Sequence, residues 1–383
     1  MPPDRQSRTN SKQAGGVDGH GNHFDDRVAI ASELIGVDAA VALLLAQDGI
    51  TNGAIYALLS LALVLVFAVT RVIYIPQGEF VAYGALSMAA INAGALPPTM
   101  WLVVTLGIAV AIVDSVAAIR EGAKSRLPVI ILKNAVLPIL AVIVVRYLPL
   151  KDLAYPVQIL IALGFVVPLG PQIYRLAFQP VAEASVLLLL IVAVAVHFVL
   201  VGMGLFFFGA EGGRIPAFTD GGLTLGPAYV QYQTIWIVGI AALLIAGLAL
   251  FFEHSIYGKA LRATAINRTG ARLMGISADL AGKLCFTLSA LVGAFSGILI
   301  APITTVYYDT GFLIGLKGFV GAIIGGLASY PLAAAGSILV GLLESYSSFY
   351  ASAYKEVIVF TLIIPVLLYQ SLTTRHVDDE EDH

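Results

Sequence analysis

Two carboxylates mark this 383-residue chain because each lies beside or within a long apolar run. Glu79 follows Pro76-Gln-Gly, and Glu344 lies in Gly341-Leu-Leu-Glu-Ser-Tyr-Ser-Ser348. Acidic side chains in membrane-length segments are rare, and they usually face a bundle interior, an ion pair or a water-filled path. The chemistry they could supply is polar contact with a solute in transit, or carriage of a proton or sodium ion.

Each carboxylate also has a plainer interpretation. Glu79 would lie in the first turn of a helix that resumes after Pro76, where a negative charge is favoured by the helix dipole. Glu344 could form a structural ion pair, for which Lys317 is a possible partner. His197, alone in an apolar run, is expected to be a hydrogen-bonded interior histidine rather than a proton relay.

The sequence gives no indication of an enzyme. It contains no Walker A pattern, no H-E-x-x-H, no Cys/His metal spacing and no G-x-S-x-G. The single cysteine, Cys285, lies in an apolar run and is expected to behave as a small hydrophobe. We therefore expect no cofactor in this chain, and any ATP that drives it must be bound by another polypeptide.

The composition excludes water as the main solvent. Hydrophobic residues make up 59% and charged residues 12%, with a mean hydropathy of +0.91, against about 45–50% and about 25% in soluble domains. The net charge of −3 and the lack of a basic stripe give no support for nucleic-acid binding.

Membrane-length apolar stretches, each of roughly 20 residues, recur along the chain. They predict an all-α polytopic transmembrane helix bundle of about 8–10 spans, with broken or re-entrant segments. The ten candidates are 48–70, 76–94, 100–119, 128–147, 155–175, 185–208, 233–252, 284–306, 331–350 and 355–372.

The predicted transmembrane domain, 41–372, has a polar stretch on either side. Residues 1–40 are rich in Gly, Asn, Ser and Asp, and we expect a disordered tail rather than a signal peptide. Residues 373–383 are expected to form a solvated acidic tail.

Two segments interrupt apolar runs, one near each end of the domain. They are Val69–Phe80, which contains Pro76, and Thr304–Gly318. A proline removes a helix hydrogen bond, and broken helices in matching halves point to a transport pathway. The glycines after the second break instead favour close helix packing, and both interpretations can hold. The predicted pathway residues are Gln77, Gly78, Glu79, Glu344 and Ser345.

The loop over 253–283 is predicted to be cytoplasmic because it is rich in Lys and Arg. The polar, glycine-rich loop over 211–233 then falls on the opposite side. A short basic segment between two spans could transmit a rigid-body movement to the bundle, or it could be an ordinary positive-inside loop.

At this loop the sequence resembles a known family. Tyr257-Gly-Lys-Ala-Leu-Arg-Ala-Thr-Ala265, Ala271-Arg-Leu-Met-Gly-Ile276 and Gly315-Leu-Lys-Gly-Phe-Val-Gly-Ala-Ile-Ile-Gly-Gly-Leu327, together with Ile75-Pro-Gln-Gly-Glu-Phe80, are similar to permeases of branched-chain amino-acid ABC transporters. The resemblance covers about 45–95 and 175–372.

The resemblance implies a multi-pass permease of the bacterial inner membrane for branched-chain amino acids or a similar small polar solute, with urea and amides included. The implied partners are a second permease subunit, two cytoplasmic ABC ATPases that consume the ATP, and a periplasmic solute-binding protein. The implied ATPase-coupling residues are Lys259, Arg262, Ala265, Arg272 and Gly275.

Three departures separate this chain from the family pattern. Residues 112–172 add about two spans, Tyr74-Ile-Pro76 replaces the usual Asn-Phe-Ala, and the chain ends in an acidic run. Two other functions remain open from the sequence. One is an ion-coupled secondary transporter that uses Glu344 or Glu79, and the other is a membrane scaffold that transports nothing.

Overall fold

The computed structural model describes residues 22–225 and 228–373, and nearly all of them are helical. The long helices are α1 (Asn22–Thr70), α2 (Gln77–Asn92), α3 (Thr99–Arg120), α5 (Leu137–Arg146), α6 (Tyr155–Val166), α8 (Val186–Phe208), α9 (Tyr232–His254), α10 (Ile256–Ile266), α12 (Ala278–Ile300), α13 (Thr310–Ile324), α14 (Tyr330–Tyr350) and α16 (Ile363–Thr373).

Shorter elements connect these helices. They are η1 (Lys124–Arg126), α4 (Leu127–Ile131), η2 (Leu132–Val136), η3 (Leu150–Asp152), α7 (Leu169–Ile173), η4 (Tyr174–Phe178), η5 (Gln179–Val181), α11 (Arg268–Leu273), η6 (Ser352–Tyr354) and α15 (Lys355–Thr361). One antiparallel hairpin, β1 (Gly222–Leu225) with β2 (Ala228–Gln231), pairs Leu223 with Val230 in the loop that was predicted to be polar.

The predicted all-α transmembrane bundle is confirmed. In the described part of the chain nine helical stretches are long and apolar enough to cross a membrane. They are Ala39–Thr70, Thr99–Arg120, Lys124–Arg146, Tyr155–Val181, Val186–Phe208, Tyr232–His254, Ala278–Ile300, Tyr330–Tyr350 and Ser352–Leu372. The tenth candidate, 76–94, corresponds to α2, which at 16 residues is too short for this set.

The prediction for the N-terminal region differs from the structure over residues 22–40, which belong to α1 instead of a disordered tail. The stretch 28–47 is rich in Ala and Leu, which favour helix over coil. Residues 1–21 and the acidic residues 374–383 of the predicted tails lie outside the described residues.

The span predicted at 284–306 begins and ends about six residues earlier, as α12. Ser277 caps its start by accepting a hydrogen bond from the Leu280 N–H at 3.4 Å, and Asp279 lies in the first turn, where the helix dipole favours it. Because these polar residues lower the hydropathy of the first turn of α12, that turn was left out of the predicted span. Pro302 follows the end of the helix.

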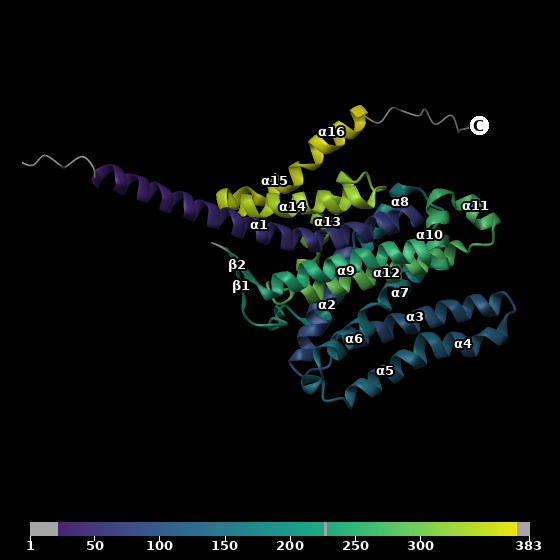
Figure 1. The fold of residues 1–383 in the computed structure, drawn as a ribbon. Coiled ribbons are helices and arrows are strands. Elements are labelled where there is room, and N and C mark those ends of the chain that lie inside the picture. The colour runs from purple at the N-terminus through teal and green to yellow at the C-terminus, as the bar shows by residue number, and fades with distance from the viewer. Residues whose placement is uncertain (1–21, 226–227, 374–383) are drawn as a thin grey trace, which may run out of the picture.

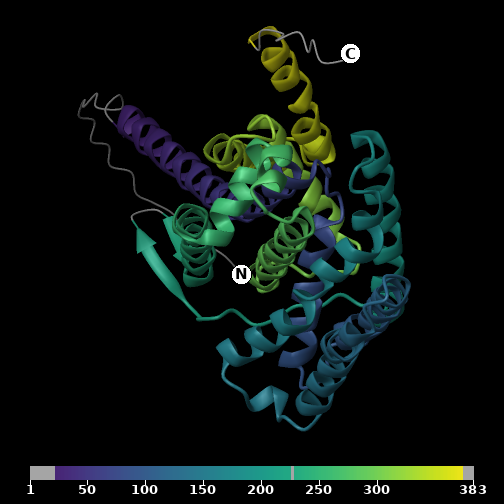
Figure 2. The same ribbon diagram turned by 90° about the vertical axis from the view of Figure 1, so that its right-hand side faces the viewer.

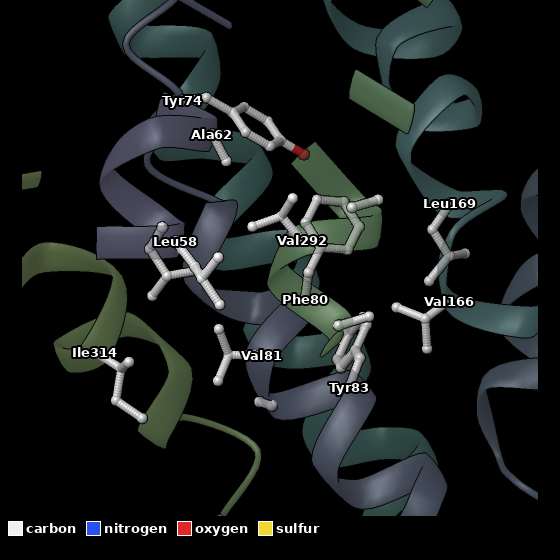
Figure 3. Packing of buried hydrophobic residues seen from close by; sticks show 14 of the residues in the cluster. Leu58, Ala62, Tyr74, Phe80, Val81, Tyr83, Val166, Leu169, Val292 and Ile314 are labelled. Atoms are coloured by element: carbon white, nitrogen blue, oxygen red, sulfur yellow. The ribbon is translucent and has the colours of Figure 1, made fainter. Parts of the chain in front are cut away.

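The inner bundle consists of α1, α2, α12, α13 and α14, which pack against one another (Figures 1 and 2). Helix α2 lies at its centre. Figure 3 shows Phe80, Val81 and Tyr83 of α2 between Leu58 of α1 and further apolar side chains, and all of these are buried. Because α2 is covered on every side, it presents almost no apolar surface to lipid.

Glycines allow α2 and α12 to approach closely. A side chain at Gly84 would overlap the backbone of Ala294, and one at Gly297 would overlap the carbonyl group of Val81. Small residues at such positions permit backbone contact between membrane helices. The packing of α2 on α12 therefore depends on the absence of side chains at both positions.

The additional region around α4, η2 and α5 forms one edge of the molecule, and α15 and α16 lie at the opposite edge (Figure 1). Of the 18 most apolar consecutive residues in the span Lys124–Arg146, only 6% are buried. In Ala39–Thr70 the corresponding share is 89%. The span of α4, η2 and α5 packs on α3, and the two form an outer hairpin at the periphery of the bundle.

Candidate translocation site

The two predicted breaks are present, and they meet inside the bundle. Helix α1 ends at Thr70 and α2 begins at Gln77, while α12 ends at Ile300 and α13 begins at Thr310. Gly78 and Gly311, at the starts of α2 and α13, lie so close that a side chain on either would overlap the carbonyl oxygen of the other. The N-terminal ends of two broken helices thus share one junction.

The hydrogen bonds of Gln77 show how deep in the bundle this junction lies. Its amide Nε2 donates to the Ser289 carbonyl oxygen at 3.0 Å, and the Ser289 hydroxyl donates to Gln77 Oε1. Ser289 lies at the middle of the 23-residue helix α12. The junction therefore lies near mid-membrane depth, where backbone irregularity is tolerated only if protein or water satisfies it.

Glu79 and His197 form a buried pair beside the junction. Glu79 Oε1 and His197 Nδ1 are 2.7 Å apart, and only 1% of Glu79 is exposed. The second oxygen, Oε2, has no hydrogen-bond partner among the described residues. The His197 ring lies 4.6 Å from that of Phe312, between ring centres. The pair links α2, α8 and α13, and Glu79 Oε2 offers acceptor capacity that the described residues do not use.

Both interpretations of Glu79 from the sequence have a counterpart in this geometry. The residue is in the first turn of α2, where the dipole favours its charge, and it also faces a polar partner in the interior. The lone histidine, expected to be hydrogen-bonded, has Glu79 as its partner.

Glu344 belongs to a second cluster. Its Oε1 accepts from Lys317 Nζ at 2.5 Å, and its Oε2 accepts from the Tyr56 hydroxyl at 2.5 Å. Lys317 also reaches Glu356 Oε1 at 3.3 Å. Both Lys317 and Glu344 are buried, so the charges are compensated by one another. The cluster ties α13 and α14 to α1 and α15.

The predicted pathway residues therefore divide into two groups. Gln77, Gly78 and Glu79 lie at the junction, and Glu344 lies in the Lys317 cluster. Ser345 belongs to neither, because its hydroxyl donates to the Leu45 carbonyl oxygen of α1 at 2.7 Å. Helix α13 connects the groups, since it carries both Phe312 and Lys317.

The predicted set of pathway residues left out several members of the junction, namely His197, Ser289, Gly311 and Phe312. A signal existed for His197, the lone imidazole in an apolar span, and for Gly311, which lies within the second break. No signal in the sequence distinguishes Ser289 or Phe312 from other residues of their helices.

The predicted coupling loop folds as α10 and α11, two short helices at one end of the bundle (Figure 1). Leu261 and Ala271 are buried against the bundle, whereas Ile266, Leu273 and Met274 are each at least 80% exposed. Large apolar side chains that protrude from a loop between spans are typical of a docking surface.

The predicted coupling residues occupy different places on these helices. Lys259, Arg262 and Arg272 are exposed, and Gly275 is exposed with a φ of +83° that closes α11. Ala265 is half-buried and lines an apolar cavity of about 880 Å³ between α1, α9, α10 and α14. Arg262, one helical turn earlier on α10, lines the same cavity, whereas Lys259 and Arg272 do not.

Helix α11 is fastened to the preceding part of the chain. Arg272 pairs with Glu183 at 2.9 Å, and Arg268 donates to the Ala182 carbonyl oxygen at 3.2 Å. Both partners lie just after η5, which follows η4. A displacement of α11 would therefore be transmitted to the C-terminal end of the α6–α7–η4 span as well as to α12.

A multi-pass helix bundle in which two broken helices meet at mid-depth is typical of membrane transporters. The family model described as "Branched-chain amino acid transport system / permease component" matches residues 45–367, and the chain belongs to this family of branched-chain amino-acid ABC transporter permeases. It is a family of transport proteins rather than of enzymes.

Curated relatives agree with this assignment. The high-affinity branched-chain amino acid transport system permease protein LivH of Escherichia coli (strain K12) is 32% identical over 225 residues, which are 55% of this chain and 72% of the relative. BraD of Pseudomonas aeruginosa, with the same description, is 29% identical over 240 residues, 61% and 77% of the two chains. No solved structure matches.

Proposed function

We propose that this chain is the membrane-spanning permease subunit of an ABC importer and that its solute, a branched-chain amino acid or a similar small polar molecule, crosses at the junction of α2 and α13. The observation that carries the proposal is the contact of Gly78 with Gly311 beside the buried Glu79–His197 pair. Broken helices that meet at mid-depth are the usual site of substrate binding in transporters.

The junction suits a zwitterionic solute. The positive dipole ends of α2 and α13 favour a carboxylate, and the unpartnered Oε2 of Glu79 can accept from an ammonium group. An amino acid carries both groups on one carbon atom. The aromatic and aliphatic side chains around Phe80 and Phe312 would then contact its apolar part.

We further propose that energy enters through α10 and α11. Exposed Arg262 and Arg272, together with Ile266, Leu273 and Met274, form a mixed basic and apolar surface on which a cytoplasmic ATPase would dock. ATP would be consumed there, and this chain would need no cofactor. A second permease subunit and a solute-binding protein on the opposite membrane face would complete the importer, which we place in the inner membrane.

One observation favours a second candidate function. A buried carboxylate in contact with an imidazole, as in Glu79 and His197, can hold a proton within the membrane. An ion-coupled secondary transporter would use this pair to couple uptake to a proton gradient.

Reconstitution separates the two candidates. The chain is co-purified with the products of neighbouring reading frames, placed in proteoliposomes and assayed for leucine uptake. We expect uptake that needs internal ATP, is blocked by vanadate and is insensitive to a protonophore. Uptake that resists vanadate and collapses with the protonophore would instead establish the ion-coupled transporter.

Variants locate the coupling surface. The double variant Arg262→Gln, Arg272→Gln is expected to lose ATPase co-purification and uptake together while it retains its fold. The matched control is Arg126→Gln, an exposed basic residue in the turn between α3 and α4, which should keep both. Equal retention by the two would contradict docking at α10 and α11.

A further inference from the structure

A second cavity, of about 450 Å³, lies between the additional hairpin and the inner bundle. It is separate from the junction and from the coupling helices. Its lining is mostly apolar, but it contains six polar side chains from five elements. They are Asp114, Lys133, Asn134, Gln172, Arg175 and Lys283.

The charges in this cavity are not balanced. Arg175 Nε pairs with Asp114 Oδ1 at 2.5 Å, which uses the single carboxylate of the lining. Within the described residues, neither Lys133 nor Lys283 has a hydrogen-bond or ion-pair partner for its ammonium group, and Oε1 of the buried Gln172 is likewise unpartnered. Lys133 is exposed and Lys283 is half-buried, so both ammonium groups are free to bind an anion that enters the cavity from the bilayer.

The backbone on both sides of the cavity is irregular. Lys133 lies in the π-helical turn Leu132–Val136, and Arg175 lies in the π-helical turn Tyr174–Phe178. Single π-helical turns within longer helices are uncommon and occur frequently at functional sites. Here they carry one cation each, from the outer hairpin and from the core.

The charged residues lie at one depth. Lys283 is five residues from the start of α12, Lys133 is six from the start of α4, and Asp114 is six from the end of α3, which places each about 8–9 Å along its helix. All three helix ends are at the end of the molecule that carries α10 and α11 (Figure 1). This depth corresponds to the boundary between headgroups and acyl chains of the inner leaflet.

We propose that this cavity binds the phosphate of an anionic phospholipid from the cytoplasmic leaflet. Lys133, Lys283 and Arg175 would hold the phosphate, and Val129 and Leu137 would contact an acyl chain. A lipid is favoured over free phosphate because the wall formed by α4 and α5 is open to the bilayer and mostly apolar. Basic pockets between membrane helices on the cytoplasmic side recognise anionic headgroups in this way.

Native mass spectrometry of the purified full-length chain in detergent tests the proposal. Phosphatidylglycerol, phosphatidylcholine and inorganic phosphate are titrated separately. For the double variant Lys133→Gln, Lys283→Gln we expect an affinity for phosphatidylglycerol lower by about tenfold or more, with weak binding of phosphatidylcholine unchanged. Inorganic phosphate should neither bind strongly nor displace the lipid.

Matched variants exclude general effects of charge or misfolding. Arg126→Gln, at the same membrane end but outside the cavity, and Arg146→Gln, at the other end of the hairpin, should bind as the unmodified chain does. Lys133→Arg with Lys283→Arg should retain binding. Asp114→Asn frees Arg175 and should strengthen binding, a gain that damage to the fold cannot produce.

Three results would overturn the proposal. The first is equal affinity of the double glutamine variant and the unmodified chain, and the second is an equal loss in Arg126→Gln. The third is displacement of the lipid by millimolar inorganic phosphate, which would assign the cavity to a free anion instead.

Discussion

Helix α1 of the inner bundle and the outer span Lys124–Arg146 are equally apolar, yet they bury very different shares of their surface. The most apolar 18-residue stretches of Ala39–Thr70 and Lys124–Arg146 have the same mean hydropathy of 2.4. Of these residues, 89% are buried in the first stretch and 6% in the second. Lipid is as apolar as a leucine side chain, so hydropathy alone does not select which helices lie inside. Within the inner bundle, close glycine contacts such as Gly84 on Ala294 and the buried ion pair of Lys317 with Glu344 hold the helices together.

The largest expected difference between the two regions concerns their charges. Lys317→Met leaves Glu344 buried with only Tyr56 as a partner, and we expect a loss of about 3–5 kcal/mol in unfolding free energy. The matched outer change, Arg146→Met, removes an exposed cation at the end of α5. Steric-trap unfolding in bicelles measures both. A similar, small loss in the two variants would remove charge pairing as a distinction between the regions.

The next difference concerns leucines. Leu58 of α1 is fully buried and Leu140 of α5 is 51% exposed. Leu58→Ala should cost about 3 kcal/mol, because it leaves a cavity. Leu140→Ala should cost less than about 1 kcal/mol, because lipid chains fill the space. The same unfolding assay compares them, and a larger loss for Leu140→Ala would mean that the outer hairpin packs against protein.

A smaller difference is expected for glycines. Gly78→Ala places a methyl group against the Gly311 carbonyl oxygen, and we expect a loss of about 1–3 kcal/mol and a lower rate of leucine uptake. Gly239, in the outward-facing helix α9, has open space around it. Gly239→Ala should leave stability and uptake unchanged. Full uptake by Gly78→Ala would show that the junction tolerates separation of the two helix starts.

The smallest effect on stability is expected at the exposed pair of Arg272 and Glu183. Removing it with Arg272→Gln should change the unfolding free energy by less than about 1 kcal/mol, because exposed ion pairs are screened by water. Lys259→Gln, on the same exposed surface but outside this pair, is the control. A loss of several kcal/mol specific to Arg272→Gln would mean that the contact between α11 and η5 is a major part of the fold.

Much of the architecture could be predicted because each span needs a long apolar run, and proline or glycine marks each break. Pro76 located the first interruption within a few residues, but the second, predicted over Thr304–Gly318, ends earlier because α13 already begins at Thr310. Helix ends were harder to place. The start of α12 was missed because Asp279 and Lys283 lie within its first turns.

The composition of the site could not be predicted from the sequence. Glu79 and His197 are separated by 118 positions, and Gly78 and Gly311 lie on different broken helices. In a soluble helix the apolar face shows which side is buried, but both faces of a membrane span are apolar. The sequence therefore contains no periodic signal for the side that turns inward, and pairing between distant spans is decided only in the folded bundle.

The segment between α12 and α13 is held mainly by its backbone. The Gly213 N–H donates to the Val306 carbonyl oxygen at 2.8 Å, and the Val306 N–H donates to the Gly213 carbonyl oxygen at 2.9 Å. The Arg214 side chain donates to the Pro302 carbonyl oxygen. The hydrogen bonds between Gly213 and Val306 are made by peptide groups alone, so they do not depend on which side chains these positions carry. Side chains around the junction can therefore be exchanged while this connection keeps its course.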